Sequence, residues 1–160
     1  MSMTIDRSRD VRSEHSPVGT AIPERAGILR QTIDWVGAVA LLGVGYVHML
    51  DVRGKLSEVP YLGVGYILLI VTTVIAAGMI VRGNPKGWLL GGGAAAATFL
   101  GYCLSRTTGL PASTDDIGNW SETLGVWSLF LEGFVVLLAV GRLQTIARSR
   151  SVRPSALVEA

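Results

Sequence analysis

The feature that most constrains this chain is an uncharged apolar run from Tyr61 to Val81, "YLGVGYILLIVTTVIAAGMIV". Its 21 residues form about 31 Å of α-helix, and the hydrocarbon core of a bilayer is about 30 Å thick. A helix with no charged side chain on any face has no surface suited to water. The run therefore predicts a transmembrane helix.

Three further apolar blocks extend this prediction. The chain is 49% hydrophobic and only 16% charged, whereas soluble domains carry about 25% charged residues. We expect four spans, at about residues 33–50, 60–81, 87–105 and 120–142. The predicted fold is all-α: an antiparallel four-helix transmembrane bundle over residues 33–143 of a multi-pass membrane protein. Trp35, Trp88 and Trp120 lie near block edges, which is typical of aromatic anchors in the headgroup layer.

The basic residues predict the orientation of the bundle. Eleven of the fourteen Lys and Arg residues lie in the N-terminal tail, the 82–86 turn and the C-terminal tail. The positive-inside rule therefore places both termini in the cytoplasm and the loops around residues 51–60 and 106–122 outside. The same rule accounts for the net charge of +2 without a nucleic-acid partner. The tails, residues 1–32 and 144–160, are predicted to be cytoplasmic. Residues 1–32 are expected to be largely disordered, and residues 146–160 disordered or loosely bound to the membrane surface.

One acidic residue interrupts the last span. Glu132 lies near the middle of "LGVWSLFLEGFVVLLAV", where a charged side chain costs about 2.5 to 3.5 kcal/mol on insertion scales. We therefore expect a protonated, neutral carboxyl that hydrogen-bonds to hydroxyl groups of other spans. The predicted intramembrane polar site comprises Glu132, His48, Thr72, Thr73, Tyr66 and Tyr102.

His48 is the only histidine in a predicted span. The simpler interpretation is an imidazole that reaches toward the membrane–water interface. The more specific one is a ligand of haem or of a metal ion. His15 lies in the cytoplasmic tail, so a second histidine ligand would have to come from another copy of the chain. The sequence leaves the cofactor unknown.

The predicted outer loop carries the densest group of charges. One arginine near the end of span three faces several acids before span four, which predicts a structural salt bridge in preference to a metal site. The predicted outer-loop ion-pair site comprises Arg106, Asp115, Asp116 and Glu122, with Trp120 beside them.

Small residues at intervals of four mark span three. Gly93, Ala97 and Gly101 share one face, so a neighbouring helix could approach closely there. The alternative is a helix kept thin to leave room for a ligand or another subunit.

Two segments carry a resemblance. "SRTTGLP" followed by "DDIGNWSETLG", and more weakly "YVHML" in the first span, resemble segments of small uncharacterised four-span membrane proteins of actinobacteria. The likeness covers mainly residues 100–134. It implies a bacterial plasma-membrane protein with a shared outer motif and implies no activity.

Three function classes remain open at this stage. The favoured one is a non-enzymatic accessory subunit that binds a membrane-protein partner or forms a homo-oligomer. The others are a proton-linked small-solute transport component that uses Glu132, and a haem- or quinone-binding redox protein that uses His48, with tyrosines and Trp127 lining the site. The sequence contains no Ser-His-Asp set, HExxH motif or phosphate-binding glycine loop, so hydrolase and kinase activities have no candidate residues.

Overall fold

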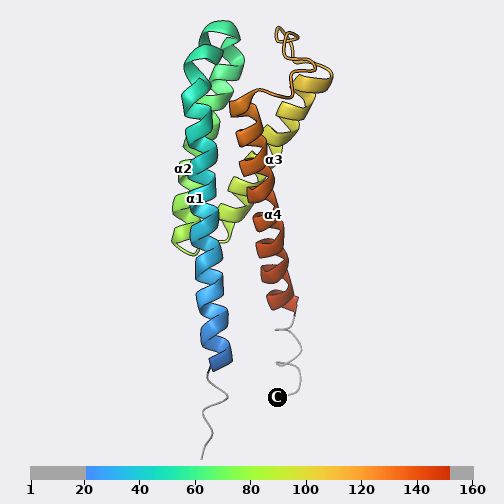
Figure 1. Cartoon of the computed structure of the whole chain (residues 1–160). Coiled ribbons are helices and arrows are strands. Elements are labelled where there is room, and N and C mark those ends of the chain that lie inside the picture. Colours follow the sequence, from blue (N-terminus) through green and yellow to red (C-terminus); the bar gives the residue numbers. More distant parts are fainter. Residues whose placement is uncertain (1–20, 152–160) are drawn as a thin grey trace, which may run out of the picture.

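The computed structural model describes residues 21–151, and this part of the chain folds into four α-helices (Figure 1). The helices are α1 (Ala21–Glu58), α2 (Pro60–Val81), α3 (Lys86–Thr107) and α4 (Thr123–Ser151). All four are long and apolar enough to cross a membrane. The α1–α2 junction and the 108–122 segment lie at one end of the bundle, here named the loop end (Figure 1). The opposite end, which holds the α2–α3 turn, is named the terminal end.

The first connection is much shorter than predicted. The expected loop at 51–60 is mostly helix, because α1 continues to Glu58 and only Val59 separates it from α2. Pro60 lacks a backbone N–H and disfavours helical geometry in the residue before it. Val59 accordingly has φ −140° and ψ 81°, and the chain reverses there. At this tight corner a Cβ on Gly63 would lie 2.6 Å from the Leu56 side chain.

Two helices are also longer than the predicted spans. Residues 21–32 and 144–151 are helical, whereas the sequence predicts cytoplasmic tails there, with disorder over residues 1–32 and 146–160. Each is continuous with an apolar helix, which supplies the nucleus that an isolated helix lacks. The rest of both predicted tails, together with His15, lies outside the described residues.

The core lies in the half of the bundle toward the terminal end. Fully or nearly fully buried side chains come from all four helices: Leu41, Val44, Ala76, Ile80, Trp88, Ala95, Val135 and Ala139. Glycines permit this packing. A Cβ on Gly37 would lie 2.2 Å from the Trp88 ring, and a Cβ on Gly91 would lie 2.7 Å from Leu41.

The predicted close contact between span three and a neighbouring helix occurs at another part of α3 than expected. A Cβ on Gly93 or Gly101 would meet no atom within 4 Å, and Gly93 and Ala97 are exposed. The prediction of tight helix packing at Gly93, Ala97 and Gly101 is wrong, because α3 diverges from α2 toward the loop end (Figure 1). The close helix contacts of α3 lie nearer its start, at Gly87 and Gly91.

Three helices are joined by a polar cluster near the terminal end. Arg142 on α4 donates two hydrogen bonds to the Asp34 carboxylate on α1, both 2.9 Å long, and the Trp88 indole on α3 donates a third at 3.1 Å. We name these three residues the Asp34 clamp. Trp88 is only 2% exposed, so the prediction that it anchors in a headgroup layer is wrong: its indole has a partner inside the bundle.

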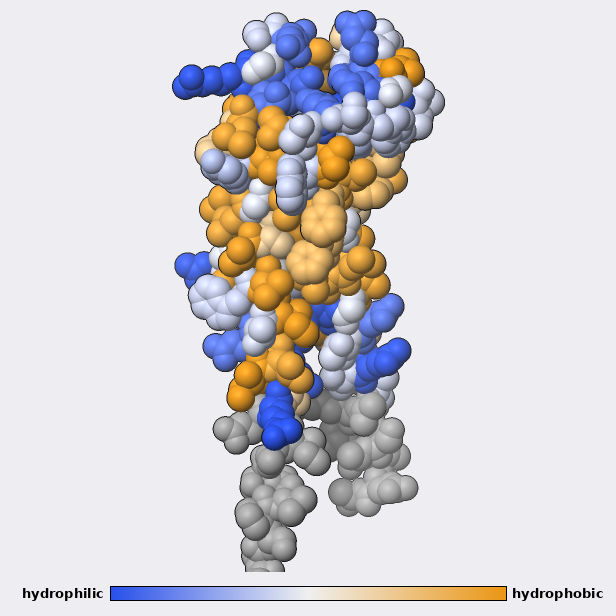
Figure 2. Space-filling view, viewed as in Figure 1, coloured by the Kyte–Doolittle hydropathy of each residue, from blue (hydrophilic) through white to orange (hydrophobic). Residues whose placement is uncertain are grey.

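The outside of the molecule has a banded character. Figure 2 shows an apolar belt between a polar cap at the loop end and polar residues toward the terminal end. Exposed large apolar side chains occur on every helix, including Val39, Leu68, Leu100 and Leu137. This distribution matches the hydropathy expected of helices that cross a bilayer.

Candidate functional site

A cavity of about 450 Å³ opens toward the loop end of the bundle. Residues of all four helices line it, and in this part of the bundle α3 runs away from α2 (Figure 1). The α3 side of its wall is a single stripe at helical spacing, which consists of Ala94, Ala97, Thr98, Gly101, Tyr102, Ser105 and Arg106. Small residues dominate this stripe, and no atom lies within 4 Å of a Cβ placed on Gly101. Span three is thin on this face, and the space it leaves is a cavity.

The floor of the cavity holds a carboxyl–imidazole pair. Glu132 on α4 is only 1% exposed and His48 on α1 only 6%, and His48 Nε2 lies 3.7 Å from Glu132 Oε1. His48 Nδ1 lies 2.9 Å from the Val44 carbonyl oxygen, so Nδ1 carries the hydrogen and donates. Ser128, one turn before Glu132, donates a 2.7 Å hydrogen bond to the same Oε1. Glu132 Oε2 is left free of protein partners.

Two tyrosines line the walls above this pair. The Tyr66 ring on α2 meets His48 edge-on, with centroids 4.6 Å apart. Tyr102 on α3 packs over Gly125 of α4, where a Cβ would lie 2.4 Å from its ring. Arg106 lies over the Tyr102 ring at 4.8 Å from the centroid, a cation–π arrangement.

Unsatisfied polar groups gather in this one place. In the part of the chain that the structure describes, three buried side-chain polar atoms have no hydrogen-bond partner: Tyr102 Oη, Arg106 Nε and Glu132 Oε2. All three residues line the cavity. Since buried polar groups in native proteins are almost always hydrogen-bonded, their coincidence in one cavity indicates a place for a ligand or for ordered water.

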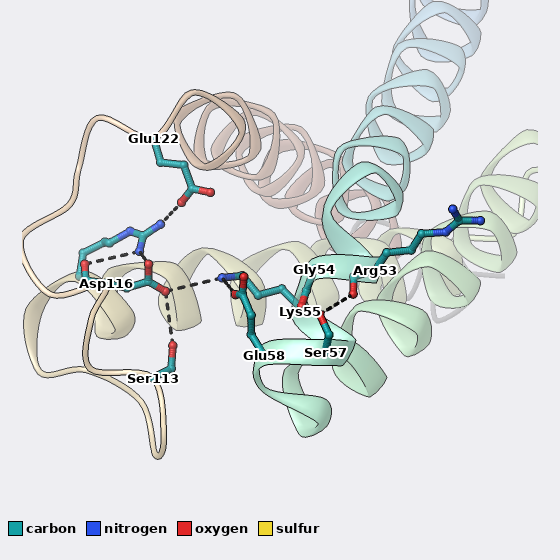
Figure 3. Close-up of polar contacts among 9 residues, drawn as sticks. Arg53, Gly54, Lys55, Ser57, Glu58, Ser113, Asp116 and Glu122 are labelled. Carbon is teal, nitrogen blue, oxygen red and sulfur yellow. Dashed lines mark hydrogen bonds and ion pairs between the residues drawn. The ribbon is translucent and has the colours of Figure 1, made fainter.

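Four charged residues that line the cavity, Lys55, Arg106, Asp116 and Glu122, form an ion cluster at the loop end, and this side of the cavity is here named its mouth. Figure 3 shows the contacts of the cluster. Arg106 Nη1 lies 2.6 Å from Asp116 Oδ1, and its Nη2 pairs with Glu122. Lys55 from the end of α1 reaches Asp116 at 3.8 Å. The 108–122 segment is also tied to α2, because Tyr61 Oη donates a 2.7 Å hydrogen bond to the Pro111 carbonyl. The segment is therefore bonded to α1, α2 and α3, and it continues directly into α4.

The charges at the mouth change the acidity of Asp116. Partial burial by itself would raise the pKa of Asp116, but the hydrogen bond from Arg106 and the nearby Lys55 charge outweigh it, so this pKa lies below its usual value. Asp116 is thus ionised throughout the neutral range and holds both cations.

The structure brings together only some of the predicted site residues. Glu132, His48, Tyr66 and Tyr102 share the cavity. Thr72 and Thr73 do not line it: their hydroxyls donate to carbonyls of their own helix, and Thr73 lies against Gly45. They are not partners of Glu132.

The outer-loop group also divides. Arg106 pairs with Asp116 and Glu122, whereas Asp115 is exposed and does not line the cavity. Trp120 meets the Tyr102 ring edge-on at 6.1 Å. Trp127, expected to line a redox site, is 59% exposed and points elsewhere.

Sequence reasoning missed three residues of the site: Asp51, Lys55 and Ser128. Ser128 precedes Glu132 by four residues, which places both on one helix face, so that spacing was a usable signal. Asp51 and Lys55 fall in a predicted loop. In the structure α1 continues through both residues, and both line the cavity.

The fold and the cavity together define an all-α protein with four helices suited to span a membrane and a polar-floored cavity among them. Among residues 21–151, no group of three or more His, Cys, Asp or Glu side chains is placed to hold a metal ion. Comparisons with protein-family models, with curated proteins and with solved structures returned no match.

Proposed function

We propose that this protein is a multi-pass membrane protein that binds a small solute in the cavity at its loop end, as a proton-linked transport component. Glu132 and His48 at the floor exchange a proton when the solute binds. The observation that carries the proposal is the coincidence of the 450 Å³ cavity with the buried, partnerless atoms of Glu132, Tyr102 and Arg106. Ligand sites are typically concave, mostly apolar and provided with a few convergent polar groups.

The cavity changes the order of the candidate functions. The accessory-subunit interpretation takes the outer loop and the smooth face of span three, at Gly93, Ala97 and Gly101, as partner-binding surfaces, but Ala97 and Gly101 line the cavity. A haem ligand at His48 would need the free Nε2 nitrogen, which faces Glu132 at 3.7 Å. The position of Glu132 therefore supports proton-linked solute binding over both alternatives.

The proposed orientation places the loop end outside a bacterial plasma membrane and both termini in the cytoplasm. It is supported by the eleven of fourteen Lys and Arg residues that flank the terminal end in sequence. A fluorescent reporter that folds only in the cytoplasm, fused after Ala160, should be bright; a dark, full-length fusion contradicts this orientation.

The test of solute binding uses a substitution that fills the cavity. Gly101→Leu adds a side chain at a cavity-lining position where the Cβ meets no atom within 4 Å, so the fold should tolerate it. Gly93→Leu is the matched control, because Gly93 lies on the same helix, has the same free space and does not line the cavity. Each protein is purified gently and its bound small molecules are identified by native mass spectrometry.

We expect a bound small molecule on the wild-type protein and on Gly93→Leu that is absent from Gly101→Leu. Glu132→Gln should weaken its retention and remove its pH dependence. Equal loading of Gly101→Leu and Gly93→Leu, or wild-type protein that carries only annular lipid, would contradict solute binding in the cavity.

A further inference from the structure

The charges that line the cavity do not balance. Two cations and four carboxyl groups line it: Lys55, Arg106, Asp51, Asp116, Glu122 and Glu132. Both cations are engaged by Asp116 and Glu122 at the mouth. Among the described residues, Asp51 has no ion-pair partner and Glu132 has only His48. The lining of the cavity therefore holds more acidic than basic side chains, and the acids outside the mouth cluster are Asp51 and Glu132.

From this imbalance we infer that the solute is a small organic cation with an apolar body, whose positive charge lies against Glu132 and Asp51 and displaces the proton held by Glu132 and His48. This inference rests on the proposed function and names its substrate class. A carboxylate in a low-dielectric site is stable only when it is paired. The cationic head would provide the partner that Glu132 Oε2 lacks.

The proton balance follows from the geometry of the pair. With His48 and Glu132 3.7 Å apart, one proton resides on the carboxyl or on the imidazole, and the pair is neutral overall in either arrangement. Binding of a fixed cation leaves Glu132 ionised and His48 neutral, so one proton leaves to solvent. Other titratable or charged groups also line the cavity. They are Asp51 and Lys55 on α1, Tyr61 and Tyr66 on α2, Tyr102 and Arg106 on α3, and Asp116 and Glu122 in the 108–122 segment.

The walls and the mouth suit such a ligand. The apolar part of the lining includes Val47, Leu62, Leu69 and Leu124, which can bury a hydrocarbon body. Aromatic rings of three tyrosines, Tyr61, Tyr66 and Tyr102, also line the cavity, and aromatic faces attract cations. Acidic side chains outnumber basic ones at the loop end, which favours the approach of cations.

The test compares three probes that share a benzyl group and differ in charge. Benzyltrimethylammonium has a fixed positive charge and no proton of its own to release, neopentylbenzene is its neutral carbon analogue, and phenylmethanesulfonate is an anion. Binding to the detergent-solubilised full chain is measured by calorimetry, with Gly101→Leu as the background for partition into micelles. Proton release is followed with a pH indicator in weak buffer.

We expect the cation to bind about tenfold or more tightly than either other probe, since one charge pair in a partly buried site exceeds about 1.4 kcal/mol. About one proton should be released per cation bound, as linkage requires for a site emptied of its proton. Glu132→Gln should abolish the release and the preference for the cation. Asp51→Asn should weaken cation binding and keep the release, and Asp115→Asn, on an exposed loop residue outside the cavity, should change neither.

Each contrary result has a distinct meaning. If the neutral or anionic probe binds as tightly as the cation, and Gly101→Leu blocks it, the cation assignment is wrong while solute binding in the cavity stands. If no probe binds to the wild-type protein, or no proton is released, the cation assignment is also overturned. If the cation binds Gly101→Leu as well as wild type, its site is elsewhere and both proposals fail. If Glu132→Gln does not fold, two measurements still test the cation assignment: cation binding by Asp51→Asn, and the number of protons that the wild-type protein releases per bound cation.

Discussion

At the scale of single residues, the position of Glu132 depends on a side chain of its own helix. The Ser128 hydroxyl is buried and donates to Oε1 at 2.7 Å, which leaves Oε2 facing the cavity. Ser128 thus positions Glu132, because its hydrogen bond holds one of the two carboxyl oxygens in place.

Removal of that hydroxyl should destabilise the protein. For Ser128→Ala we expect a loss of about 1 to 3 kcal/mol in the free energy of unfolding, because the buried carboxyl loses a hydrogen bond. Unfolding in mixed detergent measures this loss. Ser149→Ala serves as control, since its hydroxyl donates to a carbonyl on an exposed helix surface; equal effects in the two variants would show that the Ser128 bond stabilises nothing.

The depth of a polar residue along its membrane span could be predicted from the sequence, but the side of the helix on which its side chain lies could not. Counting along the helix placed Glu132 near the middle of a span, and the structure brings it to His48. Thr72 and Thr73 lie at similar depth yet face their own helix and α1. A helix that is apolar all round carries no periodic signal for its inward face, so only packing decides which hydroxyls meet the carboxyl.

At the scale of helices, glycine has two opposite uses in this bundle. Gly37 allows the Trp88 ring to lie against the α1 backbone, whereas Gly65 lines the cavity with open space around it. Sequence spacing showed that small residues share a face, but it could not show whether that face meets a helix or a cavity.

A matched pair of alanine substitutions separates these uses. Gly37→Ala should cost about 1 to 3 kcal/mol of stability, because the new methyl group would overlap the Trp88 ring and force it to move. Gly65→Ala should be neutral or stabilising by up to about 1 kcal/mol, since alanine is the better helix former. Thermal unfolding of both variants in one detergent checks this; a larger loss for Gly65→Ala would contradict the assignment of open space there.

The 108–122 segment should loosen in acid. The pKa of Asp116 is lower in the folded protein than its usual value, so its contribution is present at neutral pH and is lost as the pH falls through the folded pKa. We expect amide hydrogen exchange in this segment, corrected for intrinsic rates, to rise below about pH 4, the usual range for aspartate. Asp116→Asn should exchange fast already at neutral pH and respond little to acid; an unchanged acid response in that variant would assign the effect to another group.

At the scale of the whole molecule, the two ends of the bundle are closed differently. The Asp34 clamp joins α1, α3 and α4 near the terminal end, whereas an ion cluster surrounds an open cavity at the loop end. The count of four spans followed from hydropathy and is matched by four long apolar helices. The clamp joins residues 108 positions apart, and a single sequence carries no signal for such a pairing.

Breaking the clamp should affect the entire bundle. Asp34→Asn should cost about 1 to 3 kcal/mol of stability, because Arg142 and Trp88 lose a charged acceptor. The double exchange Asp34→Arg with Arg142→Asp should recover part of the loss caused by Asp34→Arg alone. The free energies of unfolding of wild type, Asp34→Arg, Arg142→Asp and the double exchange give the coupling energy; no coupling would mean that the pair does not join the helices energetically.

The single-residue junction at Val59 has a mechanical consequence. Because α1 and α2 are joined without slack and pack side by side (Figure 1), they form one stiff half of the cavity wall. The α3 helix is held at its start by the turn at Gly83, which has a φ of +73°, and by the Trp88 bond to Asp34. At its other end Arg106 pairs with Asp116 and Glu122 of the 108–122 segment, and Asp116 also contacts Lys55 of α1. The wall that α3 contributes to the cavity is therefore held at both ends, by a turn and a hydrogen bond at its start and by ion pairs at its last turn.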